Sequence, residues 1–253
     1  KVLAITYDFT ADALYENGTA VYSDAEKETI SKSCLIESAL LGYYDPGINN
    51  KAVGNREGVA LVGLVTGNTI LARYGLDGFV KTINGWFLPD GGTPESAAYA
   101  IMVLNGINYY GYAFRDYSDP AGFTPPENES VYSHFSVNTD TIYDQIWQNM
   151  IWTLNGDFSY PPIADSYLPT YLGTTYADYL NIAFNTSVIN SFVQEKYQNE
   201  LSYSYEALFY KNPDMSNSTE SAVEFPDIVF PYLAQGFLRT GELGRNSTLI
   251  LDA

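Results

Sequence analysis

The chain is poor in the side chains that build disulfides and metal sites. Its 253 residues include one cysteine and one histidine. A single cysteine excludes an internal disulfide, and Cys34 falls in an apolar helical pattern, so we expect a buried thiol. No Cys/His set has zinc spacing, and no glycine-rich loop lies between a predicted strand and a helix. The sequence therefore predicts no metal and no cofactor.

Positive charge is also scarce. Lys and Arg number 12 against 30 Asp and Glu, which gives a formal net charge of −18. Because nucleic acids and anionic membrane surfaces attract proteins through Lys and Arg, this balance argues against both partners. No apolar run reaches the roughly 18 residues of a transmembrane helix, so we expect no membrane insertion. No signal peptide is visible at Lys1, and a processed chain would not show one.

What the chain has in quantity is tyrosine. It contains 23 Tyr and 13 Phe, and its hydrophobic share of 46% is that of a globular protein with one good-sized core. An apolar ring with a polar tip suits surfaces that bind carbohydrate or protein. The alternative is that tyrosine replaces leucine in a hydrated core, and composition does not separate the two.

The first part of the chain is a series of predicted helices. Ser23 and Glu26 form a capping box, and Gly63 allows close packing of an apolar helix over 58–65. Further signals are Asn68 before a helix ended by Gly75, Asp77 before a helix ended by Gly85, and Thr93-Pro94 before a helix that buries Ala98, Ile101, Met102 and Leu104. The first helix begins without a cap, so we expect further elements upstream.

Later segments continue the pattern and then change character. They predict an exposed loop over 116–130, a helix over 140–154, a loop over 155–171 and two helices over 176–208. The apolar stripe expected on the helix over 140–154 consists of Ile142, Ile146, Trp147, Met150 and Ile151. Short apolar pieces over 236–241 and 247–251 predict two strands. Helical hairpins with loops between them favour an α/α toroid or a solenoid.

Five segments, in order, resemble one class of polysaccharide lyases. They are LAITYD at 3–8, Asn49-Asn50 with GLVTGN at 63–68, LPDGGTPESAAY at 88–99, PPIADS at 161–166, and FLRTG at 237–241 followed by LILD at 249–252. Together they are similar to the heparinase II/III-like and alginate lyase superfamily. The resemblance implies an all-α fold, an incomplete α/α toroid over 1–232 without its first helices. It also implies the start of a β-sandwich over 233–253, the rest of which would lie outside this chain.

Such a lyase would cleave a uronic-acid-containing polysaccharide by β-elimination. Donors neutralise the uronate carboxylate, a base removes the proton at C5, and an acid protonates the departing O4 oxygen. The resemblance assigns the carboxylate to Asn50 and the proton transfer to Tyr99. Ionisation of a tyrosine near neutral pH needs a nearby cation or donor, and Lys51 and Arg56 are the closest candidates in the sequence. We expect both to contact substrate. The plain alternatives are a turn at Asn49-Asn50 and a packing role for Tyr99.

Other candidates are spread along the chain. His134 could supply an imidazole base, although a lone histidine is more often structural. Glu95 and Asp165 are candidates for substrate contact, and they could instead be the carboxylate pair of a glycoside hydrolase. The positive end of the helix predicted after Pro94 is the simpler explanation of Glu95. Trp86 could stack on a sugar ring, although tryptophan more often packs between helices.

Glycosylation signals give a mild indication of secretion, and we expect an extracellular protein. The function predicted first is a secreted lyase acting on an acidic polysaccharide. The alternatives are a glycoside hydrolase on the same scaffold and a non-catalytic glycan-binding or structural module of a surface assembly. The Asn-x-Ser/Thr acceptors are Asn17, Asn128, Asn185, Asn217 and Asn246.

Overall fold

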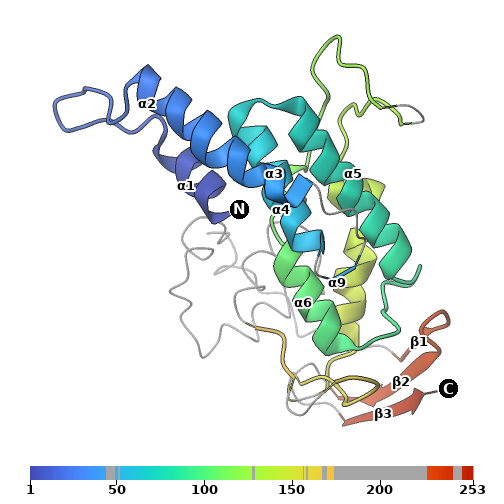
Figure 1. Cartoon of the computed structure of the whole chain (residues 1–253). Helices are drawn as coiled ribbons and strands as arrows, with labels where there is room; N and C mark the ends of the chain where they lie inside the picture. The colour runs from blue at the N-terminus through green and yellow to red at the C-terminus, as the bar shows by residue number, and fades with distance from the viewer. Residues whose placement is uncertain are drawn as a thin grey trace. The chain divides into compact units, whose positions relative to one another are not determined.

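The structure, a computed structural model, is helical with a small antiparallel sheet near the C-terminal end (Figure 1). At that level the predicted fold class is confirmed, while closure of the helices into a toroid stays a prediction. The chain forms two compact units, residues 1–82 with 105–135 and residues 83–104 with 136–253. The described residues are 1–43, 49–50, 52–126, 129–155, 157, 159–166, 170–173, 227–241 and 247–252.

Two of the three unit boundaries fall inside helices, α5 and α6, and the third falls between residues 135 and 136. The elements up to α5 are α1 (Val2–Thr10), α2 (Asp24–Thr29), the π-helix η1 (Ile30–Ile36), α3 (Glu37–Tyr43), α4 (Ala52–Thr66) and α5 (Thr69–Trp86). Those that follow are α6 (Ala97–Ile107), α7 (Tyr110–Ala113), α8 (Val137–Asp140), α9 (Tyr143–Trp152), β1 (Ile228–Phe230), β2 (Gln235–Thr240) and β3 (Ser247–Asp252).

Helices α2, η1 and α3 form one continuous helical run in the first unit (Figure 1). The predicted capping box starts it, since Ser23 Oγ accepts a hydrogen bond from the Glu26 amide at 3.3 Å. The Glu26 carboxylate in turn accepts one from the Ser23 amide at 2.8 Å. These reciprocal bonds satisfy two backbone donors locally, so the start of the run needs no tertiary contact.

The buried thiol predicted at Cys34 is wrong, because Cys34 is exposed. The middle of the run is π-helix, whose wider turn rotates the sequence relative to the helix face. Leu35 and Ala39 consequently become the buried positions of the run, which packs on α4. Leu41, an apolar residue near the end of the same run, is 83% exposed.

Helices α4 and α5 pack tightly as an antiparallel pair. Gly63 lies against Ala72, and Gly75 lies against Ala60. A Cβ at Gly63 would lie 2.1 Å from the Ala72 nitrogen, and a Cβ at Gly75 would lie 2.4 Å from the Ala60 Cβ. The close packing predicted at Gly63 is confirmed, and it depends on the absence of a side chain at both glycines.

Helix α5 is longer than the sequence signals predict. Asn68 caps it as predicted, with Oδ1 accepting from the Leu71 amide at 3.2 Å, and the stop near Gly85 is confirmed within one residue. The stop at Gly75 and the N-cap at Asp77 are wrong, because the helix runs through both. An interior glycine costs a helix about 1 kcal/mol relative to alanine. At Gly75 the packing against α4 offsets that cost.

Helix α6 begins at residue 97, three residues later than the predicted start at Pro94. Ser96 is its cap, since Ser96 Oγ accepts from the Tyr99 amide at 3.3 Å. Thr93 Oγ1 accepts a local bond from the Glu95 amide at 3.4 Å. Glu95 therefore precedes the helix, and the helix-terminus explanation of this residue does not hold.

The apolar faces of α6 and α9 contribute to the core of the second unit. Ile146, Trp147 and Met150 of α9 are buried as predicted. On α6, Leu104 is buried as predicted, but Met102 is 45% exposed. Trp147 packs edge-on to the Tyr143 ring, so it belongs to the core.

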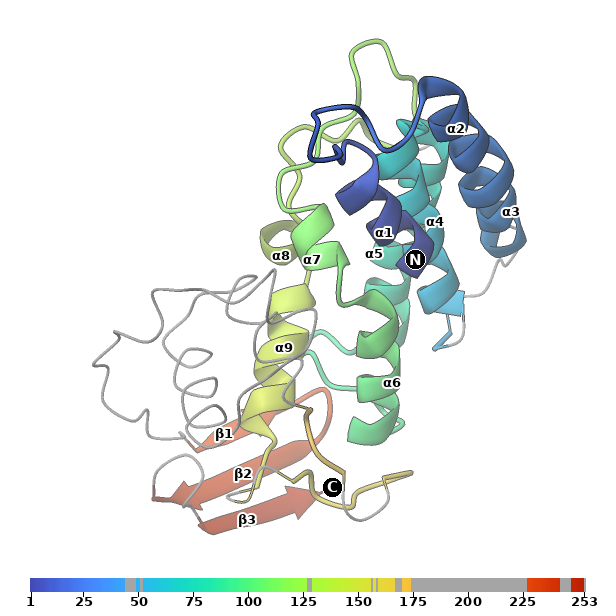
Figure 2. The same cartoon turned by 90° about the vertical axis from the view of Figure 1, so that its left-hand side faces the viewer.

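Three antiparallel strands form the sheet of the second unit in the order β1-β2-β3 (Figure 2). The two predicted strands are confirmed as β2 and β3, whereas β1 is too short for a pattern to predict. The Arg239 guanidinium of β2 donates to the carbonyl of Trp152 at the end of α9. The domain boundary predicted after residue 232 stays a prediction.

Two remaining expectations concern other parts of the chain. The helices predicted over 176–208 lie outside the described residues. Within the described residues, no helix combines the length and the apolar character needed to cross a membrane.

Candidate functional site

Each unit contains a cavity with polar side chains in its wall. The first-unit cavity, of about 560 Å³, lies between α4, α5 and the loop at 114–135. The second-unit cavity, of about 330 Å³, lies between the turn at 91–96, the start of α6, α9, the loop at 160–164 and the sheet. Both are large enough for a small molecule or part of a polymer.

A buried arginine organises the first-unit cavity. Arg73 is 2% exposed, and its guanidinium binds the Asp119 carboxylate at 2.5 Å and the Ser130 carbonyl at 3.1 Å. It also lies 3.4 Å from the Asp77 carboxylate and 3.5 Å from that of Glu129. Arg73 and Asp77 are four residues apart on α5 and share one helix face. The loop at 114–135 supplies the other partners, so this network ties the loop to α5.

Asp77 and Glu129 lie against the same guanidinium in this cavity, since Arg73 Nη2 is 3.4 Å from Asp77 Oδ1 and 3.5 Å from Glu129 Oε2. Burial raises the pKa of Asp77 to about 7, the bond to Glu129 adds to the shift, and Arg73 opposes it. The pKa of Glu129 is lowered by the bond from Asp77 and by Lys81, whose ammonium lies 3.0 Å from the Glu129 carboxylate. Tyr132 donates its hydroxyl to Asp77 at 3.1 Å. The pair therefore holds one proton near neutral pH.

Arg56, predicted to contact substrate, lies in the wall of the same cavity. It is 4% exposed, and its Nη1 donates to the Gly78 carbonyl at 3.2 Å. Its guanidinium lies 5.8 Å from the centre of the Tyr74 ring. A Cβ at Gly78 would come within 2.5 Å of the Arg56 Cδ, so glycine makes room for this side chain. The substrate contact itself stays a prediction.

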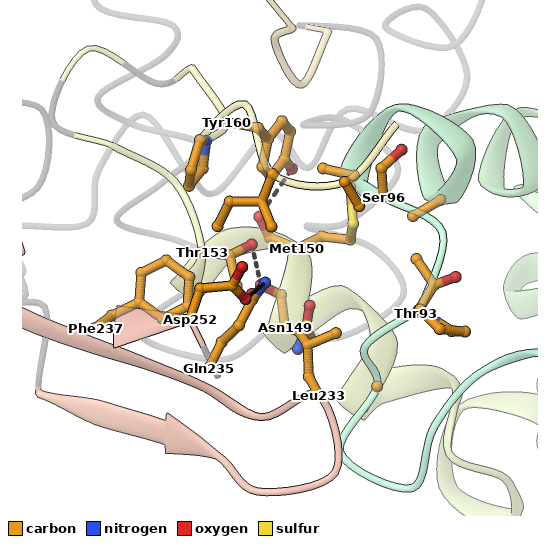
Figure 3. Close-up of a pocket in the computed structure, with 17 residues that line it drawn as sticks. Thr93, Ser96, Asn149, Met150, Thr153, Tyr160, Leu233, Gln235, Phe237 and Asp252 are labelled. Atoms are coloured by element: carbon orange, nitrogen blue, oxygen red, sulfur yellow. Dashed lines mark hydrogen bonds between the residues drawn. The ribbon is translucent and has the colours of Figure 1, made fainter. Parts of the chain in front are cut away.

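The wall of the second-unit cavity includes hydroxyl and amide side chains, among them Thr93, Ser96, Asn149 and Gln235, which are labelled in Figure 3. Thr153 Oγ1 donates to the Asn149 carbonyl at 2.8 Å, and the Tyr160 hydroxyl donates to the Met150 carbonyl at 2.8 Å. Asp252 is the one carboxylate among the described lining residues, and no Lys or Arg is among them. The described part of the wall therefore offers neutral hydrogen-bonding groups and one carboxylate.

Asp90 connects three segments around this cavity by hydrogen bonds, a role that its place in the LPDG segment did not predict. Its carboxylate accepts hydrogen bonds from the amides of Tyr232 and Leu233, at 2.8 and 3.0 Å, in the turn between β1 and β2. Its carbonyl accepts from Asn149 of α9 at 3.4 Å. An aspartate before two glycines is a turn signal, and the partner of its carboxylate lies more than 140 residues away in the sequence.

Three predicted residues lie at or near the second-unit cavity. The Asp165 amide donates to the Glu95 carbonyl at 3.3 Å, and both side chains are exposed. Their neighbours Ser96 and Ala164 line the cavity, which places Glu95 and Asp165 at its rim. Tyr99 is half-buried and is not among the described lining residues. The structure therefore brings together the segments that carry these residues, which are some 70 residues apart in the sequence.

Trp86 and His134 are not among the described residues that line the two cavities. Trp86, the last residue of α5, is half-buried with its ring edge-on to Phe87 at 4.7 Å. His134 is on an exposed loop of the first unit, and its Nδ1 lies 2.9 Å from the Asp116 carboxylate. Neither residue lines a described cavity wall, and the roles predicted for them stay predictions.

The remaining predicted residues are in the first unit or outside the described residues. Asn50 is half-buried in the turn before α4, where the Asn49 carboxamide oxygen accepts from the Ala52 amide at 3.1 Å and caps the helix. Lys51 is outside the described residues. Asn17 lies in an exposed turn and accepts from the Thr19 amide at 3.0 Å. The other acceptors, Asn128, Asn185, Asn217 and Asn246, are also outside the described residues.

Sequence reasoning predicted Arg56 of the first-unit cavity but missed its other charged lining residues, Arg73, Asp77, Lys81 and Glu129. Arg73, Asp77 and Lys81 are spaced four residues apart, which is a helical signal for one face. This helical spacing was not recognised in the sequence, because Gly75 and Asp77 were interpreted as a helix stop and a helix cap.

In the part of the chain that is described, no group of three or more His, Cys, Asp or Glu side chains is arranged to hold a metal ion. The chain matches no protein-family model, no curated protein and no solved structure.

Proposed function

We propose that the chain is the helical scaffold of a secreted polysaccharide lyase, which cleaves a uronic-acid-containing polymer by β-elimination. The observation that supports this most is the convergence of three segments on the second-unit cavity. The turn at 91–96, the loop at 160–164 and the strands around Phe237 and Asp252 all line it. The same three stretches of sequence carry part of the resemblance to this class of lyases.

The chemistry of the wall is compatible with a sugar. Saccharides are bound through many neutral donors and acceptors, with apolar contacts to the ring. Thr93 and Ser96 offer hydroxyl groups, and Asn149 and Gln235 offer amides. Amide donors are also what a uronate carboxylate needs when it must carry the charge that develops at C5. A toroid completed by a β-sandwich, as the resemblance implies, would extend this wall into a cleft.

In this proposal Tyr99, near the second-unit cavity, transfers the protons, and Asn50, a residue of the first unit, keeps the role at the uronate carboxylate that the resemblance assigns to it. Tyr99 is three residues along the chain from Ser96, which lines the cavity, and its amide bonds to the Ser96 cap. Incubation of the chain with alginate, heparin and glucuronan tests the proposal. We expect the ultraviolet absorbance of an unsaturated uronate with one of them. Tyr99→Phe should abolish it, while Tyr112→Phe, at an exposed position of the first unit, should not.

A glycoside hydrolase is the second candidate, favoured by the position of Glu95 and Asp165 at the rim of the second-unit cavity. Their backbones are hydrogen-bonded at 3.3 Å, so two exposed carboxylates project from adjoining segments. Such a pair can act as acid and base on a glycosidic bond. New reducing ends without ultraviolet absorbance, lost in Glu95→Gln and kept in Tyr99→Phe, would replace the lyase proposal with this one.

A non-catalytic glycan-binding module is the third candidate. The lack of Lys and Arg among the described lining residues favours it, because a lyase must stabilise a developing negative charge. Glycan affinity that is equal in the wild type and in Tyr99→Phe, with no cleavage by either protein, would support this candidate.

A further inference from the structure

The second-unit cavity contains buried hydroxyl groups with hydrogen-bonding capacity left over. Thr93 and Ser96 line the cavity and are 7% and 6% exposed. Each hydroxyl accepts a bond from a nearby backbone amide, at 3.4 Å for Thr93 and 3.3 Å for Ser96. Neither donates its own hydrogen to a group in the described part of the chain. A buried donor without an acceptor destabilises a fold, so we expect both hydrogens to be bound by a molecule in the cavity.

A buried amide on α9 adds an acceptor to the same wall. Asn149 is 5% exposed and lines the cavity, and its Nδ2 donates to the Asp90 carbonyl at 3.4 Å. Its Oδ1 accepts no hydrogen bond from a described residue. Separate water molecules can satisfy such groups one at a time. A ligand with several hydroxyl groups satisfies them together, because each hydroxyl both donates and accepts.

The β-sheet adds a carboxylate to this cavity. Gln235 of β2 and Asp252 of β3 are direct partners in the strand register. Because side chains two residues apart on a strand point to the same face, Gln235 lies on the face of the buried Phe237, and Asp252 lies beside it. All three residues line the cavity and are labelled in Figure 3. Gln235 Nε2 donates to Asp252 Oδ1 at 3.0 Å, and the carboxylate accepts no other hydrogen bond from the described residues.

A carboxylate in this position selects among ligands. It has no hydrogen to donate, and it accepts from hydroxyl groups in charge-assisted hydrogen bonds, which are stronger than neutral ones. It also repels a second carboxylate, more strongly in a partly enclosed cavity than in bulk water. Asp252 therefore favours the hydroxyl groups of a ligand and disfavours a ligand carboxylate.

The wall between these polar groups is apolar. Ala97, Ala100, Met150 and Ile163 line it. A sugar ring has the same two kinds of surface, with hydroxyl groups at its edge and C–H groups on its faces. The volume of about 330 Å³ is at the low end for small-molecule sites, which fits a single ring better than a longer stretch of polymer.

We propose that the second-unit cavity binds one uncharged sugar ring, and that the Asp252 carboxylate, which accepts from the hydroxyl groups of that ring, excludes a uronate ring. The inference deepens the proposed function, because it names the sugar that occupies this cavity, and it rests on that function in taking the ligand to be a saccharide. In the polymer cleaved by the proposed lyase, an uncharged sugar would then be the neighbour of the uronate.

Matched pairs of sugars test the proposal. The methyl glycosides of glucose, galactose and mannose differ from those of glucuronate, galacturonate and mannuronate only in the uncharged group that replaces the carboxylate. Titration of the whole chain with each sugar near neutral pH, followed by ligand-detected NMR, gives the affinities. We expect at least one neutral glycoside to bind, and to bind roughly tenfold tighter than its uronate partner. Binding of no neutral glycoside, or equal or tighter binding of its uronate partner, would overturn the proposal.

Variants assign the selectivity to Asp252. Asp252→Asn keeps an acceptor for Gln235 and removes the charge, so the neutral glycoside and its uronate partner should bind within roughly twofold of each other. Thr93→Val keeps the shape and removes a donor, so it should weaken binding of the neutral glycoside several-fold and leave the ratio unchanged. Asp140→Asn is the matched control and should keep the wild-type preference, since Asp140 is an exposed carboxylate of the same unit that is not among the described lining residues. An Asp252→Asn protein with the wild-type preference would overturn the role of Asp252.

Cleavage is measured separately, so the two proposals can fail independently. A preference for the neutral glycoside in a protein that yields no unsaturated uronate from any polymer would keep this inference and remove the lyase. Production of unsaturated uronate by a protein that binds both sugars of each pair equally would keep the lyase and overturn this inference.

Discussion

Replacing Gly63 by alanine should destabilise the first unit, although alanine is the better helix former. Gly58 and Gly63 both lie inside α4, and alanine at an unhindered helical position gains about 1 kcal/mol over glycine. At Gly58 a Cβ would meet Lys1 at 3.4 Å, an ordinary contact. At Gly63 it would lie 2.1 Å from the Ala72 nitrogen and 2.8 Å from the Leu71 carbonyl carbon, and backbone atoms cannot rotate away.

The two substitutions share one propensity gain and differ in the space they meet. Overpacking of this kind costs about 1–3 kcal/mol, so Gly63→Ala should be less stable than Gly58→Ala by about that amount. Gly58→Ala should be more stable than the wild type by somewhat less than about 1 kcal/mol. The difference between the variants isolates the close approach of α4 and α5, since the helix propensity term cancels.

Urea unfolding followed by far-ultraviolet circular dichroism measures the two free energies. Hydrogen exchange of the α4 and α5 amides then reports whether the loss is located in this helix pair. A Gly63→Ala protein that is as stable as Gly58→Ala would refute the tight packing of α4 against α5 at Gly63.

Two further predictions concern buried charge. Burial raises the pKa of Glu57 from 4.5 to about 7, against the opposing effect of Lys1, so the folded protein keeps a proton that the unfolded chain releases. Stability should therefore fall by roughly 3 kcal/mol as pH rises from 4.5 to 7, and the fall should be absent in Glu57→Gln. Parallel pH profiles of the two proteins in urea unfolding would contradict this. Asp119→Asn leaves the buried Arg73 without its closest carboxylate and should cost about 3 kcal/mol or more, whereas Asp116→Asn, at an exposed pair, should cost less than about 1. Equal unfolding midpoints for these two variants would show that the Asp119 pair contributes little.

The first-unit cavity illustrates what a one-dimensional pattern leaves out. Gly75 and Asp77 are an ordinary helix stop and helix cap by residue type, and the sequence contains no reason to prefer another role. The reason is α4, whose Ala60 needs the space at Gly75. Once α5 runs through, Arg73, Asp77 and Lys81 share a face, and the loop at 114–135 completes the network.

For the second-unit cavity, the sequence predicted more of the lining segments than it did for the first-unit cavity. The segments that carry Glu95, Asp165 and Phe237 are singled out by sequence alone, and the structure places them around one cavity. What the sequence could not show is how they are held. Asp90 joins the turn before α6 to the β1–β2 turn and to Asn149 of α9, through bonds between residues far apart in the chain.

The sequence by itself determined the features that depend on near neighbours. The Ser23 capping box, the Asn68 cap, the apolar stripe of α9 and the strands β2 and β3 are confirmed, because local hydrogen bonds and side-chain periodicity are sufficient for them. Only the tertiary structure decided the exposure of Cys34, the role of Gly75 and the proton affinity of Asp77. Each of these depends on which groups from distant segments fill the space around the residue, and burial and electrostatics are set by that space.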